Sequence, residues 1–263
     1  MPLYNLPLHK PTAITAAVAG NFSAPGAHEF CVARGNTLEL LRGPSAAADP
    51  DAGSAMVSVH VQRVFGNIRG LSTIRLWAED RDHLVLSCDA GKTTVLRFDA
   101  SAGGRGGASS GAFVNVTQAV FGKTGCRRVV PGQWLCCEQS ANGGRVLMIG
   151  ASEKQKLVYK IGRDADSGAV TLSSPLLVDR ARVITFDCAS VEVGTENPEF
   201  ACLEVDYGDL DDNDNDGRSV AAHSASKMLS YYKMDLTLNN VSLTESVPTE
   251  RSASRLVPVP GGD

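Results

Sequence analysis

The sequence predicts an all-β fold, and within that class a β-propeller built from four-stranded antiparallel blades. Short β-prone apolar runs alternate with tight polar turns along the chain, and 26 glycines and 12 prolines supply the turns. Paired runs begin near residues 29, 83, 134 and 200, at intervals of 54, 51 and 66 residues, and the last interval is long because it contains an acidic insertion. A unit of about fifty residues matches one propeller blade. A sandwich or an open barrel also has many short strands, but neither predicts a regular period.

The first hairpin is the clearest of four. The runs 29–34 (EFCVAR) and 37–42 (TLELLR) are separated only by Gly35 and Asn36. A two-residue turn that contains glycine favours a hairpin, because glycine readily adopts the positive φ that such turns need. The other expected hairpins pair 83–88 with 93–98, 134–138 with 145–151, and 200–205 with 228–236.

Further strands are expected between the hairpins, at 56–64, 68–77, 157–161 and 185–193. A repeated motif supports this period. The Val-Phe-Gly triplet at 64–66 recurs at 120–122, and each copy precedes the next unit. With one blade per ~50 residues, residues 1–263 are expected to form the amino-terminal portion of a propeller, incomplete at roughly four to five blades.

Three segments are expected to be flexible loops, at about 43–55, 100–111 and 208–225. The first two are rich in Gly, Ser and Ala and bury too little apolar surface to become ordered. The third begins with GDLDDNDNDG, which contains five aspartates and no basic residue. This stretch accounts for the acidity of a chain whose formal net charge is −4 at pH 7.

The composition argues against a membrane protein or a secreted one. No apolar run approaches the ~20 residues of a membrane span, and the amino terminus lacks the basic start and apolar core of a secretory signal. The seven cysteines form no C-x-x-C pair, and several lie inside apolar runs. We therefore expect free thiols and a reducing compartment, the cytosol or the nucleus.

One acidic motif is a weak candidate for a metal site. Asp212, Asp214 and Asp216, with Gly217 behind them, match the first positions of a calcium-binding loop. The carboxylate that such a loop needs at its last position falls on His223. A solvated acidic loop is the favoured interpretation, and no metal is expected.

No pattern indicates catalysis or a bound cofactor. Gly122-Lys123-Thr124 resembles the end of a phosphate-binding loop, but Thr117 stands where that motif needs its first glycine. The chain also lacks a nucleophile elbow, and its five histidines form no pair with ligand spacing. The sequence thus predicts a protein that is not an enzyme.

Basic residues in the middle of the chain are the best candidates for a recognition surface. Arginine suits such a role because its planar guanidinium binds carboxylates and phosphates through two hydrogen bonds. The alternative is that these side chains simply face solvent on their strands. The candidates for partner binding are Lys123, Arg127, Arg128, Lys154 and Lys156, with Arg145 nearby, and a protein or RNA contact is expected at Arg127 and Arg128.

Several segments in order resemble a known family. They include FGKTGCRR from Phe121, EKQKLVY from Glu153 and ENPEFACLEVDY from Glu196. Together they closely resemble the amino-terminal region of the splicing factor 3B subunit 3 family, from Tyr4 to the terminal VPGGD. The wider superfamily contains the large subunit of the damage-specific DNA-binding protein and the largest subunit of the cleavage and polyadenylation specificity factor, which the quoted blocks resemble less.

The resemblance implies a non-catalytic protein built from several propellers. Such a protein is a scaffold of the splicing factor 3b complex in the U2 small nuclear ribonucleoprotein. It binds the HEAT-repeat subunit and the small subunits of that complex. Contact with RNA is expected to be indirect or weak. Two alternatives stay open: a propeller adaptor of the DNA-damage-binding or cleavage and polyadenylation type, and a calcium-binding propeller enzyme that uses the acidic loop.

Overall fold

The computed structural model describes residues 11–43, 56–77, 79–102, 111–122, 129–140, 143–191, 196–208 and 227–259. Residues 44–55, 103–110 and 209–225, which make up most of the three expected loops, lie outside these ranges. The described strands are β1 (Ala16–Gly20), β2 (Glu29–Arg34), β3 (Thr37–Arg42), β4 (Val57–Arg63), β5 (Ile68–Ile74), β6 (His83–Cys88), β7 (Lys92–Asp99), β8 (Ala112–Val120), β9 (Trp134–Cys137), β10 (Val146–Gly150), β11 (Glu153–Arg163), β12 (Val170–Leu172), β13 (Leu176–Val191), β14 (Glu199–Asp206), β15 (Lys227–Asp235) and β16 (Asn240–Thr249). No helix in the described part of the chain has the length and apolarity that a bilayer crossing requires.

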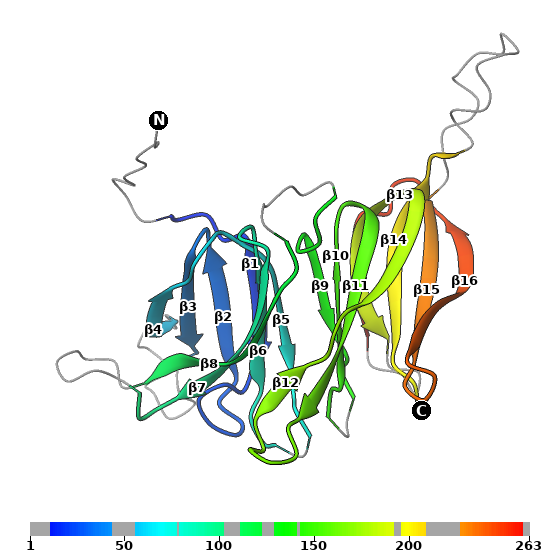
Figure 1. Ribbon diagram of the computed structural model, residues 1–263. Coiled ribbons are helices and arrows are strands. Elements are labelled where there is room, and N and C mark those ends of the chain that lie inside the picture. The colour runs from blue at the N-terminus through cyan, green and yellow to red at the C-terminus, as the bar shows by residue number, and fades with distance from the viewer. Residues whose placement is uncertain are drawn as a thin grey trace, which may run out of the picture.

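The strands form four antiparallel blades, which follow one another across the molecule in chain order (Figure 1). Blade 1 is β1-β2-β3-β4, and blade 2 is β5-β6-β7-β8. The remaining strands form one path, β16-β15-β14-β13-β11-β10-β9, with β12 paired to β11. The long strand β13 joins two blades on this path, because its first residues pair with β11 and its later residues pair with β14. Blade 3 is therefore β9, β10, β11 and the start of β13, and blade 4 is the rest of β13 with β14, β15 and β16.

The first strands of successive blades lie side by side. β1 lies against β5, β5 against β9, and β9 against β13, as innermost strands do around a propeller axis. Among the described strands none pairs blade 4 with blade 1, so these four blades leave the ring open (Figure 1). The predicted all-β propeller with four-stranded antiparallel blades is confirmed.

All four expected hairpins are present, as β2–β3, β6–β7, β9–β10 and β14–β15. In the first, Arg34 lies opposite Thr37, and Gly35 has the positive φ of 59° that the turn was expected to need. The expected strand at 157–161 is longer than predicted, because β11 begins at Glu153. The expected strand at 185–193 is the second part of β13, which begins at Leu176.

The sequence pattern missed four strands, β1, β8, β12 and β16. β1 reads AAVAG, and alanine and glycine have low strand propensity. β16 is largely exposed and polar at the edge of blade 4, so it lacks the apolar run that marks a buried strand. Both form through pairing with a hydrophobic neighbour, β2 and β15 respectively.

The hydrophobic core consists of three clusters, and each lies between two neighbouring blades. Blades 1 and 2 share Phe22, Leu38, Leu40, Leu84, Leu96, Phe98 and Phe113. Blades 2 and 3 share Ile74, Val85, Val95, Leu147, Ile149 and Tyr159. Blades 3 and 4 share Val146, Met148, Val158, Phe200, Tyr232 and Met234. A blade thus buries its apolar side chains against the next blade, which makes neighbouring blades depend on one another.

A close backbone approach joins blade 2 to the segment that leads into blade 3. Gly91, in the β6–β7 turn, has a φ of +72°, and its carbonyl accepts hydrogen bonds from the backbone N–H groups of Phe121 (2.9 Å) and Gly122 (3.3 Å). A Cβ at Gly91 would lie only 1.9 Å from the carbonyl oxygen of Gly122. The glycine is therefore required for its size as well as for its conformation.

Gly91→Ala is expected to lower the free energy of unfolding more than Gly168→Ala does. Both positions have positive φ, so each alanine carries the left-handed penalty of about 1–2 kcal/mol. Only Gly91 is crowded, since a Cβ at Gly168 meets nothing within 4 Å. We expect about 2 kcal/mol of additional loss at Gly91, measured by urea unfolding. Equal losses at the two positions would contradict the close approach of Gly91 and Gly122.

Candidate interaction surface

The candidate recognition residues divide between described and undescribed parts of the chain. Lys123, Arg127 and Arg128 lie outside the described residues, and so do Asp212, Asp214 and Asp216. Arg145, Lys154 and Lys156 are described, and all three belong to blade 3. Within the ranges given above, no group of three or more His, Cys, Asp or Glu side chains is placed to hold a metal ion.

Lys154 and Lys156 lie two residues apart on β11 but point to different surroundings. The pairing of β11 with β13 shifts register between Glu153 and Gln155, and Lys154 has a positive φ of 72° at this bulge. The Lys154 side chain is 50% exposed, and its Nζ is 3.8 Å from a carboxylate oxygen of Asp179. Lys156 is 1% exposed. Lys154 thus lies at the surface, whereas the burial of Lys156 removes it from the expected surface.

Lys156 belongs to an ionic network buried between blades 3 and 4. Glu204 is fully buried, and its carboxylate oxygens lie 2.5 Å from Lys156 Nζ and 3.0 Å from Arg180 Nη1. The hydroxyl of Tyr232 donates a hydrogen bond to the same carboxylate, at 2.9 Å. Burial and the neighbouring Glu204 raise the pKa of Tyr232 above its ordinary value, so the hydroxyl remains a donor. The four side chains come from β11, β13, β14 and β15, and they tie the two blades together.

The sequence carried a signal for this network that the basic-cluster interpretation overlooked. Lys156 directly precedes the apolar run LVY, and Glu204 interrupts the run ACLEV. A single charge inside an apolar strand indicates a buried partner, because a lone buried charge is strongly unfavourable. In the structure, these two opposite charges, Lys156 and Glu204, lie in neighbouring blades and form an ion pair.

Arg145 also has internal partners, although its side chain is 40% exposed. Its guanidinium donates to Glu138 at 2.8 Å and to the backbone carbonyl of Glu196 at 2.9 Å. The residue therefore links the β9–β10 hairpin of blade 3 to the segment that leads into β14. Its first role is to hold blades 3 and 4 in position.

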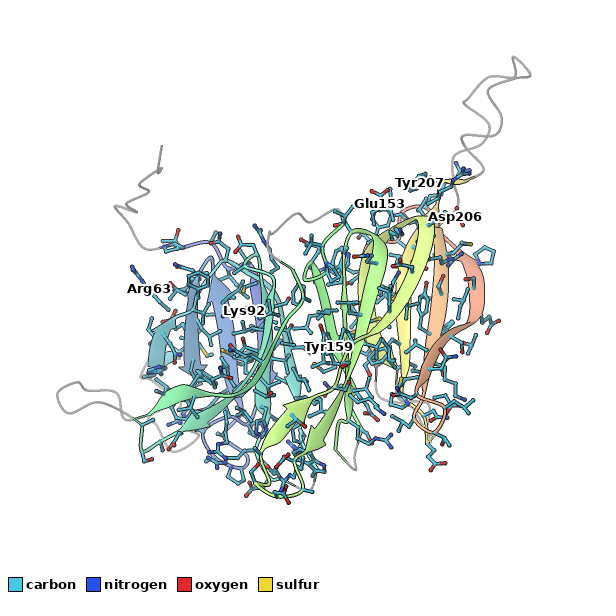
Figure 2. All side chains as sticks on the ribbon, in the orientation of Figure 1. Arg63, Lys92, Glu153, Tyr159, Asp206 and Tyr207 are labelled. Carbon is cyan, nitrogen blue, oxygen red and sulfur yellow. The ribbon has the colours of Figure 1, made fainter. Side chains whose placement is uncertain are left out.

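The exposed end of blades 3 and 4 forms a polar rim around Lys154. Figure 2 shows Glu153, Asp206 and Tyr207 together at this end, and the hydroxyl of Tyr207 donates a hydrogen bond to Glu153. Asp206 lies 3.7 Å from Arg180 Nη2, which connects the rim to the buried network. Charges of both signs are thus held by internal partners at an exposed edge, as is usual for the rim of a protein interface.

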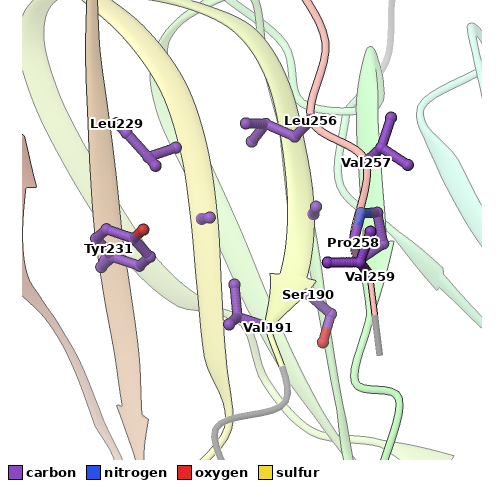
Figure 3. A pocket seen from close by; sticks show the side chains of 10 residues that line it. Ser190, Val191, Leu229, Tyr231, Leu256, Val257, Pro258 and Val259 are labelled. Carbon is purple, nitrogen blue, oxygen red and sulfur yellow. The ribbon is translucent and has the colours of Figure 1, made fainter. Parts of the chain in front are cut away.

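Apolar surface is exposed on the outer faces of blades 1 and 4. On blade 4, a pocket of about 240 Å³ lies between the strands and the segment that follows β16. Figure 3 shows Leu256 and Val259 of that segment across from Leu229 and Tyr231. The backbone N–H of Leu256 donates to a carboxylate oxygen of Asp187 at 2.8 Å, which fixes the segment. Blade 1 exposes Phe30, Val57 and Val61.

A polar cavity of about 620 Å³ lies where the first strands of the four blades meet. Each blade, or the segment just before it, contributes one polar residue to the lining, namely Thr15, Arg69, Gln133 and Asp187, and Ser254 and Arg255 of the segment after β16 complete it. The cavity follows the propeller axis, and its charges are mixed. This is the position of the central channel in a propeller.

The six described cysteines are free thiols, and five of them are buried. Burial raises the pKa of the Cys137 thiol to about 12 and that of Cys31 further above its ordinary value. A buried thiol with a raised pKa is a poor nucleophile. These side chains act as small hydrophobic residues of the cores, as the sequence predicted.

The axial strands, the cores shared between blades and the continuous passage from one blade to the next define a β-propeller domain. The family described as RSE1/DDB1/CPSF1 first beta-propeller matches residues 13–262. The chain therefore belongs to this family, which confirms the resemblance found in its sequence blocks.

Individual relatives are similar along the whole chain. Spliceosome-associated protein 130 A of Arabidopsis thaliana is 40% identical over 262 residues, and Splicing factor 3B subunit 3 of Danio rerio is 40% identical over 263 residues. Each comparison covers 100% of this chain. Pre-mRNA-splicing factor prp12 of Schizosaccharomyces pombe is 35% identical over 261 residues, or 99% of this chain. The chain spans 20% of the length of each of these relatives.

Lys156→Met is expected to destabilise the protein far more than Lys154→Met. Removing Lys156 leaves the Glu204 carboxylate buried with one cation fewer, and breaking a buried pair costs about 3 kcal/mol or more. The exposed pair of Lys154 with Asp179 is screened by solvent, so its loss is expected to cost about 0.5 kcal/mol or less. Urea unfolding of the two variants measures the difference.

A double variant separates the lost pairing from any lost packing. Because replacing both charges of a buried pair by apolar groups is often neutral, adding Glu204→Leu to Lys156→Met is expected to restore part of the lost stability. A double variant that is less stable than Lys156→Met alone would contradict this view of the network.

Proposed function

We propose that this chain is a scaffold domain of the nuclear pre-mRNA splicing machinery, which acts through protein contacts and not through catalysis. The observation that carries the proposal is the 40% identity, along the whole chain, to proteins named as splicing factor 3B subunit 3 or as spliceosome-associated. By this analogy the partners are the HEAT-repeat subunit and the small subunits of the splicing factor 3b complex, and any contact with RNA is subsidiary to them.

The names of the relatives favour splicing over the sister functions. The matched family also includes proteins of the DDB1 and CPSF1 types, so family membership alone leaves repair and 3′-processing adaptors open. The relatives described above carry splicing names in a plant, a fish and a yeast. The proposal therefore takes splicing as the function and a repair or polyadenylation adaptor as its alternative.

The geometry suits a scaffold. The inter-blade cores and the network around Glu204 hold successive blades in fixed relation, which gives partners a rigid surface. The polar rim near Lys154 and the exposed apolar side chains of blade 1 provide chemically different contact areas. The basic residues Arg127 and Arg128 are proposed as a third contact, on the strength of their sequence alone.

Affinity capture from nuclear extract tests this function. We expect the tagged chain to retain a HEAT-repeat splicing subunit, identified by mass spectrometry, together with U2 small nuclear RNA. Reversing Arg127 and Arg128 to glutamate is expected to reduce the captured subunit about tenfold, because like charges then face each other across the contact.

The matched control reverses Arg251 and Arg255, two exposed arginines of the segment after β16, and should leave capture unchanged. Capture of cullin-ligase or polyadenylation proteins in place of splicing proteins would overturn the splicing proposal in favour of its alternative. Unchanged capture by the Arg127→Glu/Arg128→Glu variant would remove those two residues from the interface.

A further inference from the structure

A groove of about 180 Å³ lies between blades 1 and 2, where the chain passes from β4 to β5. Buried Leu86 and Leu96 lie at its base. Arg63 and Phe65, which are exposed, and half-buried Lys92 line the rest of it, and Figure 2 shows Arg63 and Lys92 on the blade 1 and blade 2 side of the molecule. The groove therefore combines an apolar base with an aromatic ring and two cations.

The exposure of Phe65 is not explained by the fold. Its side chain is 79% exposed, which is unusual for a phenylalanine in a short connection. Phe121 occupies the same place in the next Val-Phe-Gly triplet, between β8 and β9, and it packs against the core that blades 2 and 3 share. The equivalent connection packs its ring partly against a core, whereas the connection at Phe65 leaves its ring exposed. Folding therefore does not require the exposure of Phe65.

The backbone holds Phe65 in place on both sides. The N–H of Val64 donates to the carbonyl of Asn36 at 2.9 Å, which ties the connection to blade 1. The N–H of Asn67 donates to a carboxylate oxygen of Asp89 at 2.7 Å, which ties it to the β6–β7 turn of blade 2. The exposed ring is thus presented from an ordered connection, and a ligand need not order it on binding.

Two cations next to the ring are available to an anion. Lys92 Nζ lies over the Phe65 ring, 5.8 Å from its centre, and Arg63 is exposed. Asp89 lies on the neighbouring turn, but Asn67 and Arg69 already bind its carboxylate. Between these cations and the carboxylates of the described residues, no ion pair forms.

We propose that this groove binds single-stranded RNA, with one base stacked on Phe65 and the adjoining phosphates contacted by Arg63 and Lys92. Proteins hold single strands with an exposed aromatic ring beside cations, since bases stack on the ring and phosphates pair with the cations. An acidic peptide would use the two charges but does not require the ring. The choice of RNA over DNA rests on the splicing function proposed above.

Fluorescence anisotropy with a labelled oligouridine of about ten nucleotides tests the proposal on the whole chain. We expect Phe65→Ala to raise the Kd about tenfold, because one stacked base is lost, and Phe65→Trp to keep the wild-type affinity. Arg63→Gln and Lys92→Gln should each weaken binding and lower the slope of log K against log salt by about 0.7.

Matched controls separate a local site from general charge and from misfolding. Arg97→Gln removes one exposed cation from β7, the strand that Lys92 begins, and should leave affinity unchanged. Phe65→Ala should unfold at the wild-type Tm, since the ring is exposed. Duplex RNA of the same length should bind more weakly than the single strand, because its bases are not free to stack on the ring.

Several results would overturn the RNA site. Oligouridine binding that Phe65→Ala leaves unchanged would do so, as would the absence of binding at low salt. The groove would be a peptide site if a tyrosine-containing polyglutamate peptide bound through Phe65 and oligouridine did not bind. If the chain captures splicing proteins normally but does not bind RNA, only this inference fails. If it binds RNA through Phe65 but does not capture splicing proteins, only the proposed function fails.

Discussion

The stacking of each blade on its neighbour is the constraint on which the rest of the structure depends. All three core clusters lie between blades, so a four-stranded sheet of this chain buries its apolar side chains only when the next sheet is present. This dependence explains why the connection from blade 1 to blade 2, at 64–67, is short and hydrogen-bonded to both blades. It also fits the close approach of Gly91 to Gly122, which ties the segment after β8 to blade 2.

The same constraint organises the charged residues. At the junction of blades 3 and 4, β13 runs without a break from one blade into the other, and Arg180 lies on it where Lys156 and Glu204 meet. The buried network therefore stabilises the junction where blades 3 and 4 share β13. Side chains outside the stacked cores, among them Lys154 and Phe65, are exposed. A rigid stack with chemically distinct exposed edges is a suitable structure for a scaffold.

The sequence predicted the parts of this fold that depend on residues close together in the chain. Gly35 between two apolar runs predicted a hairpin because the turn and both strands are adjacent in the chain. β1 and β16 were missed because their strand conformation comes from pairing with β2 and β15, and their own residues do not require it. Lys156 was assigned to the surface because its partner Glu204 is distant in sequence, and only the blade geometry brings the two charges together. Phe65 and Phe121 have the same local sequence, so their different burial was also beyond a local pattern.

Hydrogen exchange of a single core variant tests the central claim most directly. Leu147 on β10 of blade 3 packs in the cluster that blade 3 shares with Val85 and Val95 of blade 2. In Leu147→Ala, measured by mass spectrometry, amide protection should fall in β6 and β7 of blade 2 as well as in β9, β10 and β11, because the two blades share one core. Loss of protection confined to blade 3, with β6 and β7 as protected as in the wild type, would contradict the account.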